Sequence, residues 1–398
     1  MDATLLNALR DPAGVPFYPV VFQALYILTW ALHIAFVLLS IGSMSLSLVG
    51  SGKQKNNANW KILTAHMIQT GKVSVSLLIV LGVAPLLFTQ VIYDPNWYVT
   101  NALSGLWVFT FIYALIVGYT TFYWYYYANK KERGRLIGFF SFGVLVFAGV
   151  LMHVFAVESI QPEQWMNWYA PGGVVDTSGL NFHMDPVRLL FMVSLSAPVV
   201  GIFLQNYSDF LSTRKDFTKE YIDFARGLGT KIALVGLLVS AVLFAAWMLQ
   251  EGLLFNPLSL AIVAAVLILL FMVKSVQRSY LTTLWLVVVA LLISGMRELI
   301  RFELMDKLGY SIYDYPMNID WPSVAMFLST FVVLGFTGVG FIATLSWRAG
   351  KTEGVFDAGK DPLVTKLANS TIAILIVWCL VYFGWGMFTV FHNSFAAA

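Results

Sequence analysis

Long apolar runs separated by short polar stretches are the dominant pattern of the chain. A helix needs about 20 predominantly apolar residues to cross a bilayer, and ten runs are long enough. They lie at 17–50, 62–93, 103–128, 136–158, 186–206, 227–250, 257–276, 279–302, 321–347 and 366–391. The pattern therefore predicts an all-α fold, a polytopic membrane helix bundle of about ten transmembrane helices.

Composition supports this prediction and excludes other classes of protein. Hydrophobic residues make up 59% of the 398 residues and charged residues 11%, whereas charged residues are roughly a quarter of a soluble domain. A disordered chain would be far less hydrophobic. The only cysteine, Cys379, excludes a disulfide scaffold. The net charge of +3 comes without a Lys/Arg block, so we expect no nucleic-acid partner.

Loop charges predict an orientation, because Lys and Arg accumulate in short cytoplasmic loops. Most basic residues, Arg278 among them, lie in loops that follow odd-numbered spans. We therefore expect both termini on the outer side of the membrane. Residues 1–16 lack the basic start and short apolar core of a signal peptide, so the first span is expected to be retained.

A single membrane domain covering 1–398 is the simplest organisation, since the sequence shows no interdomain linker and no clear repeat. The longest expected outer loop, 159–185, contains Trp165, Trp168 and Tyr169. These aromatic residues form either an interfacial belt or a surface for a partner.

Ionisable residues inside the spans are the candidate chemistry, because such groups are costly in lipid and usually mark a function or a paired partner. The set comprises His33, His66, Lys72, His153, Arg297, Glu298 and Arg301.

Arg297, Glu298 and Arg301 close the eighth span, and Glu298 shares a helix face with Arg301 at i, i+3. In a structural interpretation these two form a buried ion pair. In a functional interpretation Glu298 ligates a haem iron while the arginines neutralise the haem propionates. The spacing leaves both interpretations open.

The histidines leave similar alternatives. His33 either hydrogen-bonds another helix or binds iron. His153, at about the depth of Glu298, is a candidate second haem ligand. His66 and Lys72 lie nearer the expected cytoplasmic end and are candidates for a proton path.

Several familiar motifs are absent from the sequence, including Cys-x-x-Cys-His, zinc spacings, HExxH and a Walker loop. Histidine pairs 13 or 14 residues apart on one helix are absent as well. Any haem would therefore be held by ligands from different helices.

Short phrases in a fixed order carry a family resemblance. They are His33-Ile-Ala-Phe-Val-Leu-Leu-Ser-Ile-Gly42, Gly82-Val-Ala-Pro85, Phe88-Thr-Gln90 with Asn96-Trp97, Ile160-Gln161-Pro162, and Glu298-Leu-Ile-Arg301. This order resembles subunit I of the cytochrome bd-type quinol oxidases over roughly 17–348, with the span 366–391 as an addition.

The resemblance implies that His33 and Glu298 are axial ligands of high-spin haem, meeting at one iron, and that Arg301 supports the propionates. The chain departs from the family elsewhere. Leu190, Phe191 or Met192 replaces the low-spin haem histidine, and the quinol loop is reduced to about 250–256. Ser104 and Ile112 replace two glutamates that supply protons, which leaves a neutral lining.

These features predict a haem-containing subunit of a respiratory electron-transfer complex in a prokaryotic cytoplasmic (inner) membrane, possessing one or two haems b. The expected partners are a second membrane subunit and an outer-side c-type cytochrome or iron–sulfur protein. One alternative is a haem-free anchor that binds quinone or conducts protons through Arg297, Glu298, Lys72 and His66. Another is a terminal oxygen reductase with a rerouted proton path, which would make the chain an oxidoreductase.

Overall fold

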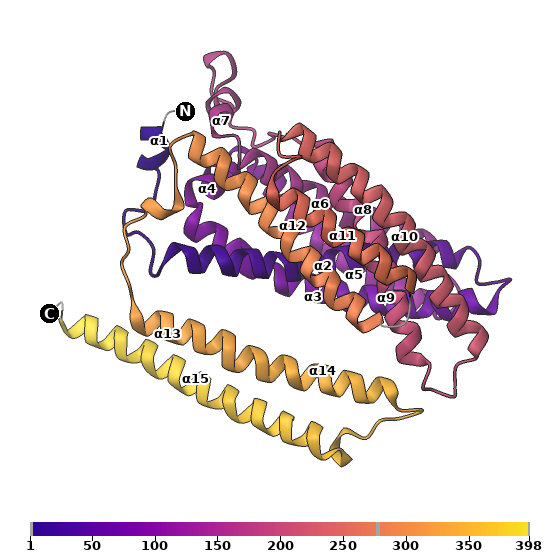
Figure 1. The fold of residues 1–398 in the computed structure, drawn as a ribbon. Helices are drawn as coiled ribbons and strands as arrows, with labels where there is room; N and C mark the ends of the chain where they lie inside the picture. Colours follow the sequence, from indigo (N-terminus) through magenta and orange to yellow (C-terminus); the bar gives the residue numbers. More distant parts are fainter. Residues whose placement is uncertain (1–2, 276–278, 397–398) are drawn as a thin grey trace. The chain divides into compact units, whose positions relative to one another are not determined.

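The computed structural model describes residues 3–275 and 279–396 (Figure 1), so Arg278, counted above among the loop charges, lies outside the described residues. Every regular element in the described part is helical. Ten of its helical segments are long and apolar enough to cross a membrane. The predicted all-α membrane bundle is therefore confirmed, while the side that each terminus faces stays a prediction.

The chain divides into two compact units, and the first comprises Met1–Asp209 and Lys219–Pro316. Its long helices are α2 (Pro19–Ser51), α3 (Ala58–Ile92), α5 (Gly105–Asn129), α6 (Arg135–Glu158), α8 (Pro186–Ser194) with α9 (Ser196–Leu211), α10 (Lys219–Gln250), α11 (Pro257–Ser275) and α12 (Ser279–Lys307). Its short helices are α1 (Ala3–Ala8), α4 (Asp94–Leu103) and α7 (Pro162–Tyr169).

The second unit comprises Phe210–Thr218 and Met317–Ala398. It contains α13 (Trp321–Ser329), a π-helical turn at Thr330–Leu334, α14 (Gly335–Lys351) and α15 (Pro362–Ala396). The expected grouping placed the ninth span with the first eight and treated only the tenth as an addition. In the structure α14 packs along α15, so the ninth and tenth spans lie together in this unit. The single membrane domain over 1–398 stays a prediction.

The predicted span limits agree with the helices to within a few residues, except at the start of the sixth span. The hydropathy pattern begins that span at 227, whereas α10 begins at Lys219. The first two turns of α10 carry Lys219, Glu220 and Arg226, and these charges end the apolar run without ending the helix.

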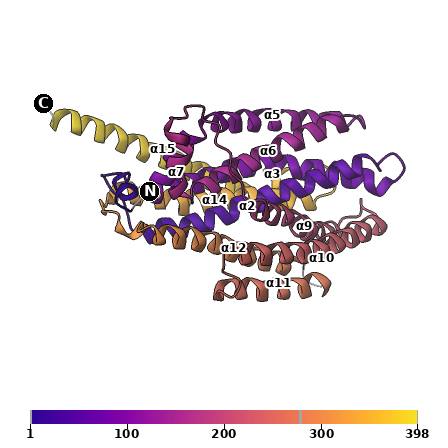
Figure 2. The ribbon, with the colours of Figure 1, turned by 90° about the horizontal axis from the view of Figure 1, so that it is seen from above.

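Within the first unit, α5 and α6 lie on one side of α2 and α3, and α10 and α11 lie on the other, with α12 next to α2 (Figure 2). Small residues permit the closest helix contacts. A Cβ atom on Gly201 of α9 would lie 2.5 Å from the backbone nitrogen of Ala233 on α10. The two backbones meet there because neither side carries a bulky side chain, a common arrangement in membrane helices.

A cluster that includes Tyr93, Trp165, Tyr310 and Tyr315 covers the end of the helix bundle at which α1, α4 and α7 lie (Figure 1). We call this cluster the aromatic cap. The guanidinium of Arg10 lies 4.1 Å from the ring centroid of Tyr310 and 4.5 Å from that of Tyr315. The amide of Val15 donates to the carbonyl oxygen of Pro316, 2.9 Å away. The cap therefore fixes the loop that follows α12, and with it the end of α12.

Candidate functional site

Two arginines and a glutamate lie inside the first unit in the last turns of α12. Glu298 is 2% exposed and Arg301 is 6% exposed. The hydroxyl of Ser294 donates to the carbonyl oxygen of Ile27, 2.7 Å away, and this bond fixes the charged segment against α2. Buried charges are costly unless they are paired and hydrogen-bonded, so their partners decide what this site is.

Glu298 is only half satisfied. Its Oε1 accepts hydrogen bonds from the hydroxyl of Tyr93 at 2.6 Å and from Nε2 of Gln23 at 3.0 Å. Its Oε2 is buried and accepts no hydrogen bond within the described residues. Arg301 Nη1 lies 3.8 Å from Oε2, so the ion pair exists but is too long for a hydrogen bond. A buried lone pair is therefore left for another partner.

The two guanidinium groups of α12 lie against aromatic rings. Arg297 is 4.6 Å from the ring centroid of Trp30 and Arg301 is 4.8 Å from that of Tyr93, while Tyr26 lies about equally near both, at 5.2 and 5.1 Å. Such cation–π contacts stabilise the positive charge without using the N–H donors. Nη1 of each arginine is buried and meets no hydrogen-bond acceptor in the described part, while the Tyr26 hydroxyl lies close enough to both guanidinium groups to interact with them.

Arg188 of α8 is a third buried arginine; it lies near the start of the predicted span 186–206 and was not among the candidate residues. It is 6% exposed and lies 5.7 Å from the ring of Trp247. Arg297 and Arg301 are close enough to act on it electrostatically, as are Asp185 and Glu251. None of the ion pairs in the described residues includes Arg188.

We refer to Arg188, Arg297 and Arg301 as the arginine cluster. Glu298 is the one carboxylate in ion-pair contact with it among the described residues. The cluster therefore has positive charge and unused donors in a buried place, next to a carboxylate oxygen with an unused lone pair. This arrangement suits a ligand with anionic oxygens.

His33 of α2 faces α3. Its Nδ1 lies 2.9 Å from the carbonyl oxygen of Leu78. Because that oxygen can only accept, Nδ1 carries the proton of the neutral ring and Nε2 carries the lone pair. A Cβ on Gly82 would lie 2.9 Å from Cε1 of His33, so the ring fits only because residue 82 is glycine. Metal-binding histidines commonly donate their other ring N–H to a backbone carbonyl in this way.

The structure does not bring His33 and Glu298 to one iron. Gln23, which holds Glu298, precedes His33 by ten residues on the same helix, which corresponds to about 15 Å along the axis. Two axial ligands must each lie within about 2 Å of the metal. The difference in depth does not support one shared iron, and the joint ligation of haem by His33 and Glu298 stays a prediction.

His153 is 9% exposed, and its Nε2 accepts a hydrogen bond from the amide of Asp185 at 3.2 Å. This contact joins α6 to the start of α8 and supports a structural role for the side chain. Its role as a second haem ligand stays a prediction.

His66 and Lys72, predicted as a proton path, contact different helices. His66 Nδ1 hydrogen-bonds the hydroxyl of Tyr207 on α9, which is 2.7 Å from the hydroxyl of Tyr221 on α10. Lys72 instead lies 4.0 Å from the ring of Tyr126 on α5. The two side chains leave α3 in different directions, so the structure does not join them.

A buried carboxylate that sequence reasoning missed lies beside Ser104. Glu158, fully buried at the end of α6, accepts a hydrogen bond from Ser104 Oγ at 2.5 Å and is 3.2 Å from Nδ1 of His183. The ring of His183 stacks on Trp168 at 4.1 Å. The expected neutral lining is therefore wrong at Ser104, because the carboxylate comes from a neighbouring helix. An acidic residue at the end of an apolar span was the available signal.

Within the described residues no three His, Cys, Asp or Glu side chains come together as a metal site. No known protein family matches the chain, and no curated protein matches it either.

Proposed function

We propose that this chain is a haem-bearing membrane subunit that transfers electrons in a respiratory complex. The observation that carries the proposal is the arginine cluster, with its two buried Nη1 atoms that lack acceptors. A guanidinium without an acceptor in a dry site is unfavourable, and the two propionates of a haem would supply the missing anionic oxygens.

The donor sets fit such a group. Arg297 and Arg301 would hold propionates, Oε2 of Glu298 is available as an iron ligand nearby, and Nε2 of His33 is available deeper in the bundle. Their separation favours two haem sites with one of these ligands each. Bound haem b supplies an iron that accepts and returns one electron, and burial and the arginine charges would set its potential.

The proposed membrane, orientation and partner proteins depend on which end of the helix bundle faces outward. Loop charges favour an orientation in which the end nearest the arginine cluster is on the outer side. The proposed membrane, a prokaryotic cytoplasmic membrane, follows from the family resemblance. That end would transfer electrons to or from a c-type cytochrome or iron–sulfur protein, and a second membrane subunit would complete the complex.

Haem content of the purified protein tests the proposal directly. A pyridine haemochrome assay is expected to give one or two protohaems per chain. Replacing both Arg297 and Arg301 with glutamine should lower that number, and in any haem retained the reduction potential should fall because positive charge near iron stabilises the reduced state.

Lys72→Gln is the matched control, since it also removes a cation from a membrane helix. The Lys72 ammonium lies over tyrosine rings of α5 and not at the arginine cluster. Its haem content should equal that of the unmodified protein. A colourless unmodified protein would reject the proposal and favour the haem-free anchor.

Glu158 gives specific support to a second candidate, a terminal oxygen reductase. It places a protonatable group beside Ser104, where the family resemblance leads us to expect one. Oxygen consumption with quinol or with a reduced cytochrome should then fall in Glu158→Gln but not in Glu163→Gln, a change at an exposed position of α7. If the protein consumed no oxygen, the oxygen-reductase candidate would be rejected and the electron-transfer subunit would remain as the proposed function.

A further inference from the structure

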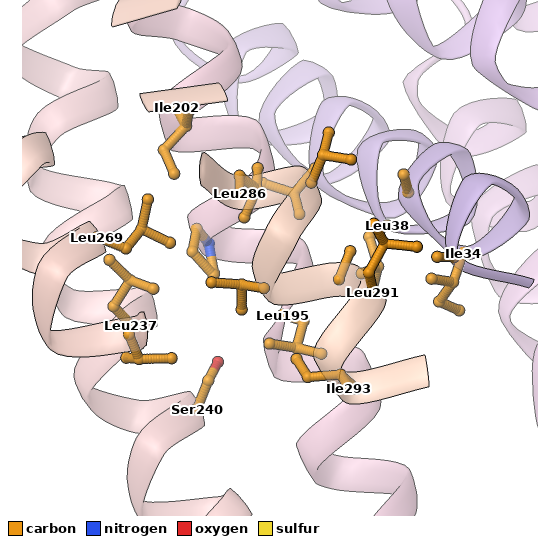
Figure 3. Close-up of a pocket in the computed structure, with 18 of the residues that line it drawn as sticks. Ile34, Leu38, Leu195, Ile202, Leu237, Ser240, Leu269, Leu286, Leu291 and Ile293 are labelled. Carbon is orange, nitrogen blue, oxygen red and sulfur yellow. The ribbon is translucent and has the colours of Figure 1, made fainter. Parts of the chain in front are cut away.

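The first unit contains an apolar cavity of about 360 Å³, with Leu38, Leu237 and Ile293 among the side chains around it (Figure 3). Asn206 and Ser240 supply two of its few polar groups, and none of its lining residues is ionisable. Specificity in a ligand site comes from a few placed polar or charged groups. The cavity alone therefore does not distinguish one apolar molecule from another, whereas a charged site on the surface of the same unit does select a ligand.

Two lysines of the first unit place their ammonium groups against one aromatic ring. Lys72 Nζ lies 4.0 Å from the ring centroid of Tyr126, and Lys130 Nζ lies 4.8 Å from it. Lys72 belongs to α3, while Tyr126 is in the last turn of α5 and Lys130 directly follows that helix. The ring stabilises each cation, but two like charges this close repel each other, and more strongly where little water surrounds them.

The chain supplies no carboxylate to neutralise these two cations. Within 3–275 and 279–396, no ion pair includes Lys72 or Lys130. Glu132 is the acidic residue of the loop between α5 and α6, and it pairs with Lys61 at 2.6 Å. Because an unpaired cation in a membrane span is costly, an anion from outside the chain would stabilise this arrangement.

A tyrosine hydroxyl adds a neutral donor beside the cations. The ring centroid of Tyr123 lies 5.7 Å from the Lys72 ammonium, and its hydroxyl accepts a hydrogen bond from that of Tyr119 at 3.2 Å. In the described part of the chain the Tyr123 hydroxyl donates to no acceptor, so its own proton is available. We call Lys72, Tyr123, Tyr126 and Lys130 the lysine–tyrosine site. Its two ammonium groups and its O–H suit the oxygens of a phosphate group.

The lysine–tyrosine site lies at the level of lipid head groups. Tyr126 is one turn from the end of α5, and the loop that follows carries Lys131 and Arg133 at exposed positions. Because the Lys72 ammonium contacts the ring of Tyr126, it lies at this level too, as expected for a long cationic side chain that reaches from a span toward the membrane surface.

An apolar strip on α3 continues from this site toward the other end of the helix. Val73, Leu77 and Val80 are exposed and share one helix face, since they are spaced at i, i+4 and i+7. The strip is about 10 Å long. It would be covered by the hydrocarbon chains of a lipid whose head group is bound at the site.

We propose that the lysine–tyrosine site binds an anionic phospholipid, with the phosphate between the two ammonium groups and the acyl chains along the strip of α3. Phosphatidylglycerol carries a negative charge that neutralises the cations, whereas the ammonium group of phosphatidylcholine cancels the charge of its own phosphate. Loop charges favour the cytoplasmic side for this end of the bundle, and the cytoplasmic leaflet is the one with a negative surface potential.

This site is distant from the arginine cluster. On α3, Lys72 lies about 30 Å along the axis from Tyr93, which donates to Glu298. The inference therefore does not depend on bound haem. A colourless protein that keeps the lipid preference would reject the haem proposal and leave this one standing, whereas a haem protein without the preference would do the reverse.

Lipid preference of the purified full-length protein tests the inference. Native mass spectrometry in mild detergent measures binding as phosphatidylglycerol or phosphatidylcholine is titrated into the delipidated protein. The unmodified protein should bind the first phosphatidylglycerol about tenfold more tightly than phosphatidylcholine, since two lysines act on its charge. In the double variant Lys72→Gln with Lys130→Gln, the two lipids should bind equally.

Lys131→Gln with Arg133→Gln is the matched control, because it removes the same charge from exposed positions of the adjacent loop. This variant should keep the preference, and so should Ala241→Phe, which fills part of the apolar cavity. Loss of the preference in the loop variant would indicate diffuse attraction to a basic surface, and loss in Ala241→Phe would place the lipid in the cavity. Either result would overturn the inference.

Tyr123→Phe tests the hydroxyl separately, because it keeps the ring and removes the donor. Its affinity for phosphatidylglycerol should fall about threefold, the effect of one hydrogen bond, while Tyr113→Phe, at an exposed position of α5, should bind as the unmodified protein does. Equal affinity in Tyr123→Phe would overturn the role of the hydroxyl. Displacement of phosphatidylglycerol by an equal concentration of inorganic phosphate would show that the site takes the free anion, and would overturn the assignment to lipid.

Discussion

At the scale of single residues, the hydrogen bonds that each candidate ligand already makes decide whether it has a lone pair left for a metal. His33 and Glu298 each keep one buried or half-buried atom with an available lone pair, while Nε2 of His153 already accepts a backbone hydrogen bond. An available lone pair is what a metal ligand requires. The first two residues therefore remain the stronger ligand candidates.

Gly82 is expected to control the position of His33. In Gly82→Ala the added Cβ would lie 2.9 Å from the imidazole, so α2 and α3 must separate or the ring must rotate. Overpacking of this kind costs about 1–3 kcal/mol. Thermal unfolding in detergent should show a lower midpoint for Gly82→Ala.

Gly143→Ala in α6 is the control for this measurement, because its Cβ would meet nothing within 4 Å. That variant should unfold at the same temperature or slightly above, since alanine favours a helix over glycine. An equal loss of stability in both variants would mean that close packing at His33 is not the cause.

Glu251 should make stability depend on pH. Burial raises its pKa, and this outweighs the hydrogen bond from Trp247 and the charge of Arg188, which lower it. A carboxyl whose folded pKa lies above its unfolded value of about 4.3 binds more protons in the folded state. Stability is then highest below about pH 4 and falls as pH rises through the folded pKa.

Glu251→Gln keeps an acceptor for Trp247 and removes the titration. Thermal midpoints measured from pH 4 to 8 should fall less with rising pH in this variant than in the unmodified protein. Parallel curves would show that Glu251 does not titrate differently on folding.

At the scale of elements, the segment 159–185 between α6 and α8 is held by a few hydrogen bonds to Glu158, the last residue of α6. Glu158 accepts from Ser104 Oγ and from the amide of His183, and Trp165 Nε1 donates to the Glu158 carbonyl oxygen at 2.9 Å. The aromatic residues expected either at the interface or at a partner thus differ in environment, because Trp165 is buried whereas Tyr169 is 46% exposed.

Removal of the Glu158 carboxylate should release this segment. In Glu158→Ala the amide and the partly exposed ring of His183 lose their acceptor, while Ser104 Oγ keeps the carbonyl oxygen of Asn181, 3.0 Å away. A buried donor left unsatisfied costs about 1–3 kcal/mol. Limited proteolysis should cut within 170–180 faster than in the unmodified protein. Glu163→Ala, at an exposed position of α7, should be cut at the original rate.

At the scale of the whole molecule, the direction of successive spans predicts which loops share a side of the membrane. The orientation itself rests on loop charge. With Cys379 replaced by serine, Gly172→Cys in the exposed 171–175 segment should react with an impermeant maleimide added to intact cells. Lys131→Cys should react only after the membrane is permeabilised, and the reverse pattern would invert the topology.

Local sequence determined the spans, because crossing a bilayer depends on a run of apolar residues that can be recognised without knowing its neighbours. It also identified Arg297, Glu298 and Arg301, since charges in an apolar run are conspicuous. Arg188 and Glu158 were missed because they lie at span ends, where charge is ordinary.

The tertiary structure alone decided which side chains meet. Helix pairing separated His33 from Glu298 by depth, turned His66 and Lys72 toward different helices, and brought Glu158 to Ser104. It also enclosed the apolar cavity around Asn206. Periodicity within one helix fixes a residue's face only relative to its own axis, whereas contact depends on the rotation and relative depth of two helices, and packing sets both.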